Sequence, residues 1–114
     1  MIIFLEGMNL KRRNNVAKLL KKEFEEVDIF AIGLVHNKLE KELHNNIEFD
    51  YEKTVENLID VTNVTFYLKN NDEDEKAYLT ALDELILPKA IIEVVGLNDE
   101  EIANEVINYV YTRL

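Results

Sequence analysis

A basic cluster follows the first apolar run of the chain and is the stretch best suited to bind an anion. It consists of Lys11, Arg12, Arg13 and Asn14. Gly7, which precedes the cluster, can supply a tight turn. If the cluster opens a helix, free backbone N–H groups and the helix dipole add to its charge, and such a site binds a phosphate or a nucleotide. The alternative is a solvated turn, because basic side chains at a helix start oppose the dipole.

The elements around this cluster are expected to be a strand, a helix and a second strand. Residues 2–5 form a continuous apolar run, typical of a parallel strand covered on both faces. Apolar residues recur at helical spacing after it, which predicts a helix over residues 11–26. A second buried strand is expected over residues 29–33, so the chain opens with a βαβ unit.

The rest of the chain continues the alternation of helices and strands. Asp50, Asn71 and Asn98 are the expected helix N-caps, and Asn98 with Glu101 has the spacing of a capping box. The expected elements are a short helix within 34–50, helices over 50–60 and 71–85, strands over 64–68 and 90–96, and a helix from 98 onward. Together they predict a single three-layer α/β/α domain over residues 1–114, with a mainly parallel sheet of about four strands.

Residues 2–24, IIFLEGMNLKRRNNVAKLLKKEF, resemble the opening of a thymidylate kinase or a related P-loop nucleoside monophosphate kinase. The likeness lies in Glu6 and Gly7 at the strand end and in the Ala-Lys-Leu-Leu stretch of residues 17–20. Residues 63–68 and 89–110 are similar to later elements of that family, so the resemblance covers about half of the chain. It implies a truncated, P-loop NTPase-like minimal domain.

The phosphate loop of that family is altered at three positions. Gly7 matches the first glycine, but Arg12 stands in place of the second glycine, Arg13 in place of the lysine and Asn14 in place of the serine or threonine. The loop needs glycine to turn its N–H groups inward, a lysine on the β- and γ-phosphates and a hydroxyl on Mg²⁺. An open turn would favour nucleotide binding, whereas a collapsed turn filled by Met8 or Leu10 would favour a lost site.

Other catalytic parts of the family are missing from the sequence. It has no acceptor-site Asp-Arg pair and no arginine-rich lid, and Arg113 is the only further arginine. Phosphoryl transfer depends on positioned cations. We therefore expect no kinase activity, no catalytic residue and no cofactor.

Two smaller features are interpreted as structural. His36 and His44 lack a third ligand at suitable spacing, so they are expected to be surface histidines and no metal site is predicted. Glu6, at the strand end, is expected to make a structural hydrogen bond, with a place beside the phosphate loop as the alternative.

Two features are candidates for a protein interface. The first is an acidic run, whose alternative role is to complement a helix dipole. The second is an aromatic residue that falls outside the apolar stripe of the last helix. These candidates are Asp72, Glu73, Asp74, Glu75 and Tyr111.

Composition excludes several function classes. The 114 residues carry 23 acidic and 13 basic side chains, a net charge of −10, which disfavours direct nucleic-acid binding. The chain has no cysteine, and its longest apolar run is far shorter than the roughly 20 residues that span a membrane. A cytoplasmic protein without a membrane partner is expected.

These observations leave three functional hypotheses. The first is a catalytically inactive domain that modulates a protein partner, such as a phage might encode. The second is a residual nucleotide-binding or kinase-like enzyme that uses Arg13, and the third is an acidic mimic of nucleic acid. Pairing of an edge strand or of the Tyr111 face could also form a homodimer.

Overall fold

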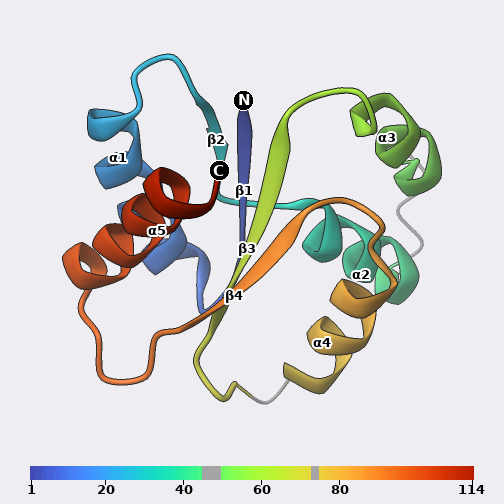
Figure 1. Cartoon of the computed structure of the whole chain (residues 1–114). Coiled ribbons are helices and arrows are strands. Elements are labelled where there is room, and N and C mark those ends of the chain that lie inside the picture. The colour runs from blue at the N-terminus through green and yellow to red at the C-terminus, as the bar shows by residue number, and fades with distance from the viewer. Residues whose placement is uncertain (45–49, 73–74) are drawn as a thin grey trace.

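The computed structural model has a four-stranded sheet with helices on both faces, as Figure 1 shows. It describes residues 1–44, 50–72 and 75–114. The strands are β1 (Ile2–Gly7), β2 (Asp28–Phe30), β3 (Asn63–Lys69) and β4 (Lys89–Glu93). The helices are α1 (Leu10–Glu23), α2 (Leu34–His44), α3 (Tyr51–Leu58), α4 (Glu75–Glu84) and α5 (Asp99–Arg113). The predicted three-layer α/β/α architecture is confirmed, and it is compatible with a P-loop-like minimal domain.

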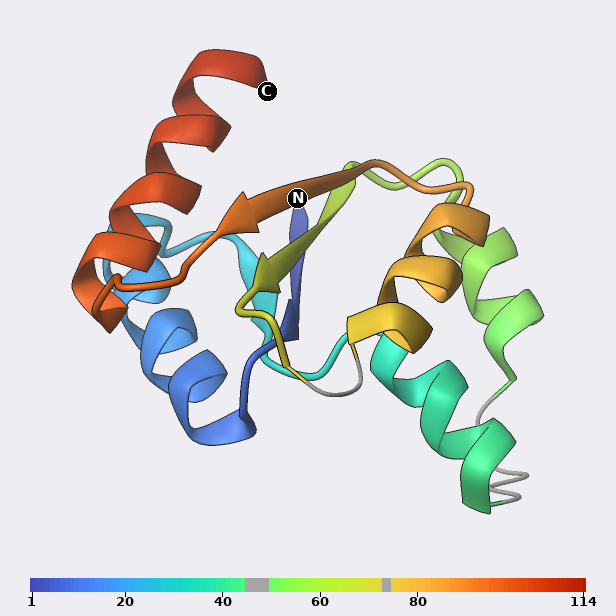
Figure 2. The ribbon, with the colours of Figure 1, turned by 90° about the horizontal axis from the view of Figure 1, so that it is seen from below.

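The strands lie in the order β2-β1-β3-β4, and every pair is parallel. From β1 the chain passes through α1 to β2, on one side of β1 in the sheet. From β3 it passes through α4 to β4, on the opposite side of the sheet's centre. Helices α1 and α5 cover one face, and α2, α3 and α4 cover the other (Figure 2). The carboxyl ends of β1 and β3 therefore form the topological switch point, where open α/β sheets bind their ligands.

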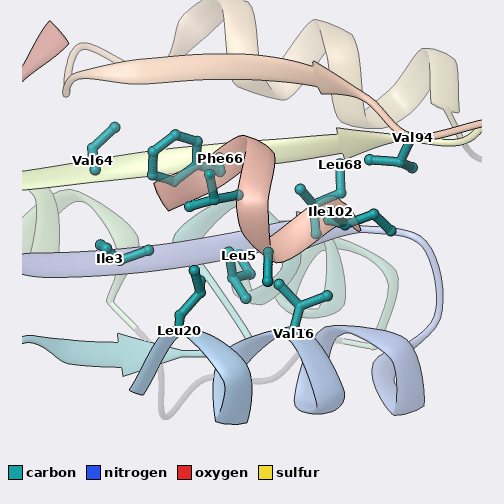
Figure 3. Packing of buried hydrophobic residues seen from close by; sticks show 11 residues of the cluster. Ile3, Leu5, Val16, Leu20, Val64, Phe66, Leu68, Val94 and Ile102 are labelled. Carbon is teal, nitrogen blue, oxygen red and sulfur yellow. The ribbon is translucent and has the colours of Figure 1, made fainter. Parts of the chain in front are cut away.

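Each face of the sheet has its own apolar core. Ile3 and Leu5 of β1 point toward Leu20 and its neighbours in α1, and Ile102 of α5 closes this core (Figure 3). The opposite core is built around Phe4 and other buried residues. Its remaining members are Leu34, Val35, Val55, Tyr67, Ala81, Leu82, Leu85 and Leu87. Alternation along β1 thus sends Glu6, two residues after Phe4, to the face covered by α2.

The central strands are covered on both faces. This outcome confirms the prediction for β1. Strand β3 has an alternating sequence, but Thr65 and Tyr67 are as well buried as their apolar neighbours. Helices α2 to α4 cover the second face of the sheet, and the polar members of β3 lie beneath them.

The prediction of a second buried strand is wrong. Strand β2 has only three residues, and it lies at the edge of the sheet with Phe30 48 % exposed. Its apolar residues resemble those of a central strand, but position in the sheet, which local sequence does not encode, decides burial. Strand β4, the other edge, ends at Glu93 rather than at residue 96, and α1 ends at Glu23 rather than at residue 26.

Two of the three predicted helix caps are confirmed. The Asp50 carboxylate accepts from the Lys53 N–H, and the capping box between Asn98 and Glu101 is complete. The third prediction is wrong, because Asn71 lies four residues before α4 and has φ of 56°. Asn71 forms part of the turn that leaves β3, a role that asparagine fills through its tolerance of positive φ.

Candidate functional site

The switch point is bordered by the end of β1, the start of α2 and the turn after β3. Gly7 pairs in register with Leu68 at this edge. A Cβ at Gly7 would lie 2.3 Å from the Leu68 carbonyl oxygen, and φ there is +86°. Glycine is therefore required by the close approach of the two strands as well as by the turn.

The turn that would form a phosphate loop is closed. Met8 and Asn9 alone separate β1 from α1, so Lys11 and its neighbours already belong to the helix. The Asn9 side chain caps α1 by accepting from the Arg12 N–H at 2.9 Å. Met8 packs against the core on the α1 face. Of the two forms considered for this turn, the structure has the collapsed one, with Met8 packed against the core.

Arg12 is directed away from the turn and connects α1 to α5. Its Nε lies 2.9 Å from Asp99 Oδ1, and its Nη2 donates to the Leu97 carbonyl at 2.7 Å. Asn15 donates to the second Asp99 oxygen at 3.0 Å. Desolvation acts to raise the pKa of Asp99, but the hydrogen bonds from Arg12 and Asn15 outweigh it and lower that pKa.

Arg13 is directed inward. It is only 3 % exposed, and Nη1 donates to the Gly7 carbonyl at 3.2 Å, while Nε is buried without a hydrogen-bond partner. The guanidinium thus closes the turn from inside. Its charge is also felt by Glu6 and His36, whose pKa values it lowers.

The predicted phosphate-binding residues therefore do not converge on one point. Gly7, Arg12 and Arg13 are engaged in strand pairing, helix packing and turn closure. Lys11 and Asn14 are exposed, and Asn14 lines a shallow groove between α1 and β2.

Glu6 makes the structural hydrogen bonds that were predicted for it, and it makes them in a fully buried position. Its two carboxylate oxygens accept from the Val35 N–H at 2.9 Å and from the His36 N–H at 3.0 Å. A carboxylate of the chain itself thus occupies the N-terminus of α2, a position favourable to anions. A Cβ on Gly33 would lie 2.0 Å from Glu6 Oε1, so glycine there makes room for the carboxylate.

Burial dominates the protonation of Glu6. Desolvation raises the pKa of this carboxyl to about 7, although the hydrogen bonds from Val35 and His36 and the charge of Arg13 act in the opposite direction. The carboxyl of Glu6 therefore titrates near neutral pH, far above the pKa of an exposed glutamate.

A polar pair that the sequence did not indicate lies beside Glu6. His36 Nδ1 is 2.9 Å from the Tyr78 hydroxyl, and the Tyr78 ring stacks on Tyr67 with centroids 5.9 Å apart. Desolvation and then Arg13 lower the pKa of His36, while desolvation and then Glu75 raise the pKa of Tyr67 to about 12. At neutral pH the side chains of His36 and Tyr67 are therefore uncharged, and they contribute to a neutral layer of side chains.

The prediction of a surface histidine is wrong for His36, which is half-buried, and the side chain of His44 lies outside the described part of the structure. The alternation of β1 and β3 places Glu6 and Tyr67 on one face, but nothing in the sequence indicates that α2 and α4 bring His36 and Tyr78 to them.

The candidate interface residues lie at opposite ends of the sheet. Asp72 is exposed near the switch point, and Glu75 is half-buried at the start of α4, with Oε1 buried and unpartnered. Glu73 and Asp74 lie outside the described residues. Tyr111, 65 % exposed at the far end of α5, donates its hydroxyl hydrogen to Glu23 at 2.8 Å. The described members of the acidic run, Asp72 and Glu75, and Tyr111 therefore cannot form one continuous surface.

Over the described residues, no group of three or more potential ligands gathers where it could hold a metal ion. Nor does the described part of the chain contain a helix long and apolar enough to cross a bilayer. Comparisons of the chain with protein-family models, with curated protein sequences and with solved structures found no match.

Proposed function

We propose that this chain is a catalytically inactive, cytoplasmic domain of thymidylate kinase-like ancestry that acts by binding a protein partner. The observation that carries the proposal is the use of both arginines of the basic cluster within the fold. Arg12 is bound to Asp99 and Leu97, and Arg13 is buried beneath Gly7.

Phosphoryl transfer requires cations that face the transferring group. The chain has one more arginine, Arg113, and its guanidinium lies 5.1 Å from the Tyr109 ring centroid near the end of α5. That position is at the opposite end of the sheet from the switch point. The arginines thus contribute to packing, which agrees with a binding role better than with catalysis.

The partner should carry a basic surface. A net charge of −10 attracts such a surface over a distance of about a Debye length. The exposed side chains of Asp72 and Tyr111 are two separate places where contact could be made.

Calorimetric titration with Mg²⁺–ATP, Mg²⁺–ADP, dTMP and pyrophosphate tests the catalytic half of the proposal. We expect no heat of binding from any of them. Binding that is lost in the Arg13→Ala variant would instead support the residual nucleotide-binding enzyme. Such a result would give a role to the unpartnered Nε of Arg13.

Affinity capture from a cell lysate tests the partner half. Capture should yield a monodisperse complex that dissociates with salt and weakens when Asp72→Asn, Glu73→Gln and Asp74→Asn are combined. The matched control neutralises Glu100 and Glu105, two exposed residues of α5. Failure to form any such complex would remove the proposal, and competition of the captured partner by DNA would favour the nucleic-acid mimic.

A further inference from the structure

Strand β4 has one open edge. It is bonded to β3 on one side and lies at the margin of the sheet (Figure 2). The Thr65 N–H donates to the Pro88 carbonyl, and the Val94 N–H donates to the Lys69 carbonyl. Backbone groups of successive strand residues point to alternate sides. The N–H and C=O groups of Lys89, Ile91 and Glu93 therefore point outward.

The charged side chains of this edge do not protect it. Proteins commonly block an open edge with a projecting lysine or glutamate. Here Lys89 folds back, and its ammonium donates to the carbonyls of Leu82, Asp83 and Leu85 at 2.7–3.1 Å. Glu93 is likewise drawn toward Lys69 of β3 at 3.4 Å. The edge presents bare backbone and an exposed Ile91.

Ile91 extends an apolar surface from the strand. Its side chain is 51 % exposed and borders a groove of about 810 Å³ between β4 and α4, to which Leu79 contributes. Ile86 and Val95, at either end of β4, are also largely exposed. Exposed apolar side chains that flank open backbone groups are typical of a strand that pairs with another strand.

We propose that β4 pairs in antiparallel fashion with β4 of a second copy of this chain. The two sheets would then form one continuous sheet across a two-fold axis. In the register that places Ile91 opposite Ile91 of the second copy, Lys89 lies opposite Glu93 on both sides of the axis. Like charges directly opposite each other on paired strands are destabilising, and this register avoids them while Lys89 and Glu93 keep their contacts with α4 and β3. The strand is thus complementary to itself.

Local charge favours a second copy over a basic peptide. The charged residues on the edge and along the groove are balanced, although the whole chain carries −10. They are Lys69, Glu75, Lys76, Asp83, Lys89 and Glu93. Self-association therefore meets little repulsion at this surface, while a basic peptide would find no excess of carboxylates.

The opposite edge of the sheet is a poorer candidate. In β2, the Asp28 N–H donates to Met1, so Asp28 and Phe30 direct their backbone groups toward β1. Only Ile29 of this three-residue strand directs its backbone N–H and C=O groups away from β1. One residue cannot hold a strand pair in register.

The dimer does not depend on the proposed function, since β4 contains no residue of the turn after Gly7 or of the acidic run, although Glu75 of that run borders the groove. Analytical ultracentrifugation over a range of concentrations tests it directly. Wild type should dimerise, and Ile91→Lys, which places two lysines opposite each other at the axis, should raise the dissociation constant about tenfold or more, equivalent to about 1.4 kcal/mol. Ile59→Lys is the matched control, because Ile59, which follows α3 directly, is 57 % exposed and is not part of β4.

A second variant gives a positive readout that does not depend on a charged substitution. The chain has no cysteine, so Ile91→Cys introduces a single thiol. Directly opposed residues have Cα atoms about 5.5 Å apart, within disulfide range. Oxidation should cross-link Ile91→Cys covalently and leave Ile59→Cys, which still pairs through β4, without a cross-link. A monomeric wild type at all concentrations, or a dimer that Ile91→Lys leaves intact and Ile91→Cys does not cross-link, would overturn the proposal.

Discussion

Glu6 lies in an unusual environment for a glutamate, since its side chain is fully buried. It is buried between β1 and α2, and both of its oxygens accept from backbone N–H groups at the start of α2. Because desolvation exceeds these favourable contacts, the pKa of Glu6 rises to about 7. The hydrogen bonds of Glu6 therefore hold α2 against the sheet, but the fold is less stable when this carboxyl is ionised than when it is protonated.

The pH dependence of stability follows from this pKa. The folded state binds the Glu6 proton more tightly than the unfolded chain does, since the pKa moves from 4.5 to about 7. The stabilisation that proton binding by Glu6 gives to the folded state is fully present below pH 4.5 and is lost as the pH rises through 7. This loss amounts to about 3 kcal/mol, at about 1.4 kcal/mol per pKa unit.

Substitution of Glu6 by glutamine should remove this dependence. Urea unfolding of wild type and Glu6→Gln between pH 5 and pH 8 measures it, and the variant should gain stability relative to wild type as the pH rises. A constant offset is also expected, because an amide accepts only one of the two N–H bonds well. Glu56→Gln, at an exposed site in α3, is the control. Parallel profiles for wild type and Glu6→Gln would contradict the assignment.

At the scale of elements, α1 and α5 are held together by more than apolar packing. Val16 and Leu20 of α1 meet Ile102 of α5 in the core, and the Arg12–Asp99 ion pair closes the ends of the two helices that lie near the switch point. The same contact withdraws Arg12 from any ligand. One side-chain conformation of Arg12 thus both packs the two helices together and turns its charge away from the turn after Gly7.

A double-mutant cycle should detect this coupling. Arg12→Ala and Asp99→Ala should each destabilise the fold, and the double variant should lose less than the sum of the two, with a coupling energy of about 1 kcal/mol. The two side chains are 28 % and 26 % exposed, so solvent only partly screens the pair. The pair of Lys38 and Glu84, in which the glutamate is 63 % exposed, is the comparison, and its coupling should be smaller. Strict additivity at Arg12 and Asp99 would indicate that the contact does not connect the helices.

At the scale of the whole molecule, the sheet has a protected centre and two unequal edges. Strands β1 and β3 are covered on both faces, β2 is short, and β4 offers three outward-facing residues. Stability should therefore be highest at the centre and should depend on assembly at β4.

Amide hydrogen exchange should resolve this distribution. The amides of β1 and β3 should be the slowest to exchange. The Ile91 amide should exchange rapidly in dilute protein and slow down as concentration rises, because it becomes bonded in the dimer. The neighbouring Ile92 amide faces β3 and provides an internal control with little dependence on concentration. Equal behaviour of Ile91 and Ile92 at all concentrations would contradict the pairing.

The sequence by itself determined the order of elements, the parallel sheet, the covered first strand and two of the helix caps. Each of these depends on interactions within a few residues, such as the bonds of Asn98 with Glu101, or on the spacing of apolar residues. Sequence also located the altered turn after Gly7 and predicted the hydrogen-bonding role of Glu6.

Only the tertiary structure decided the rest. It placed β2 and β4 at the edges, brought His36 and Tyr78 beside Glu6, and directed Arg12 outward to α5 and Arg13 inward to Gly7. The partners in the side-chain contacts lie between 6 and 87 residues apart in the chain. The edge positions of β2 and β4 depend on the order of the strands in the sheet. Local spacing carries little information on such contacts, because they depend on how whole elements pack against each other.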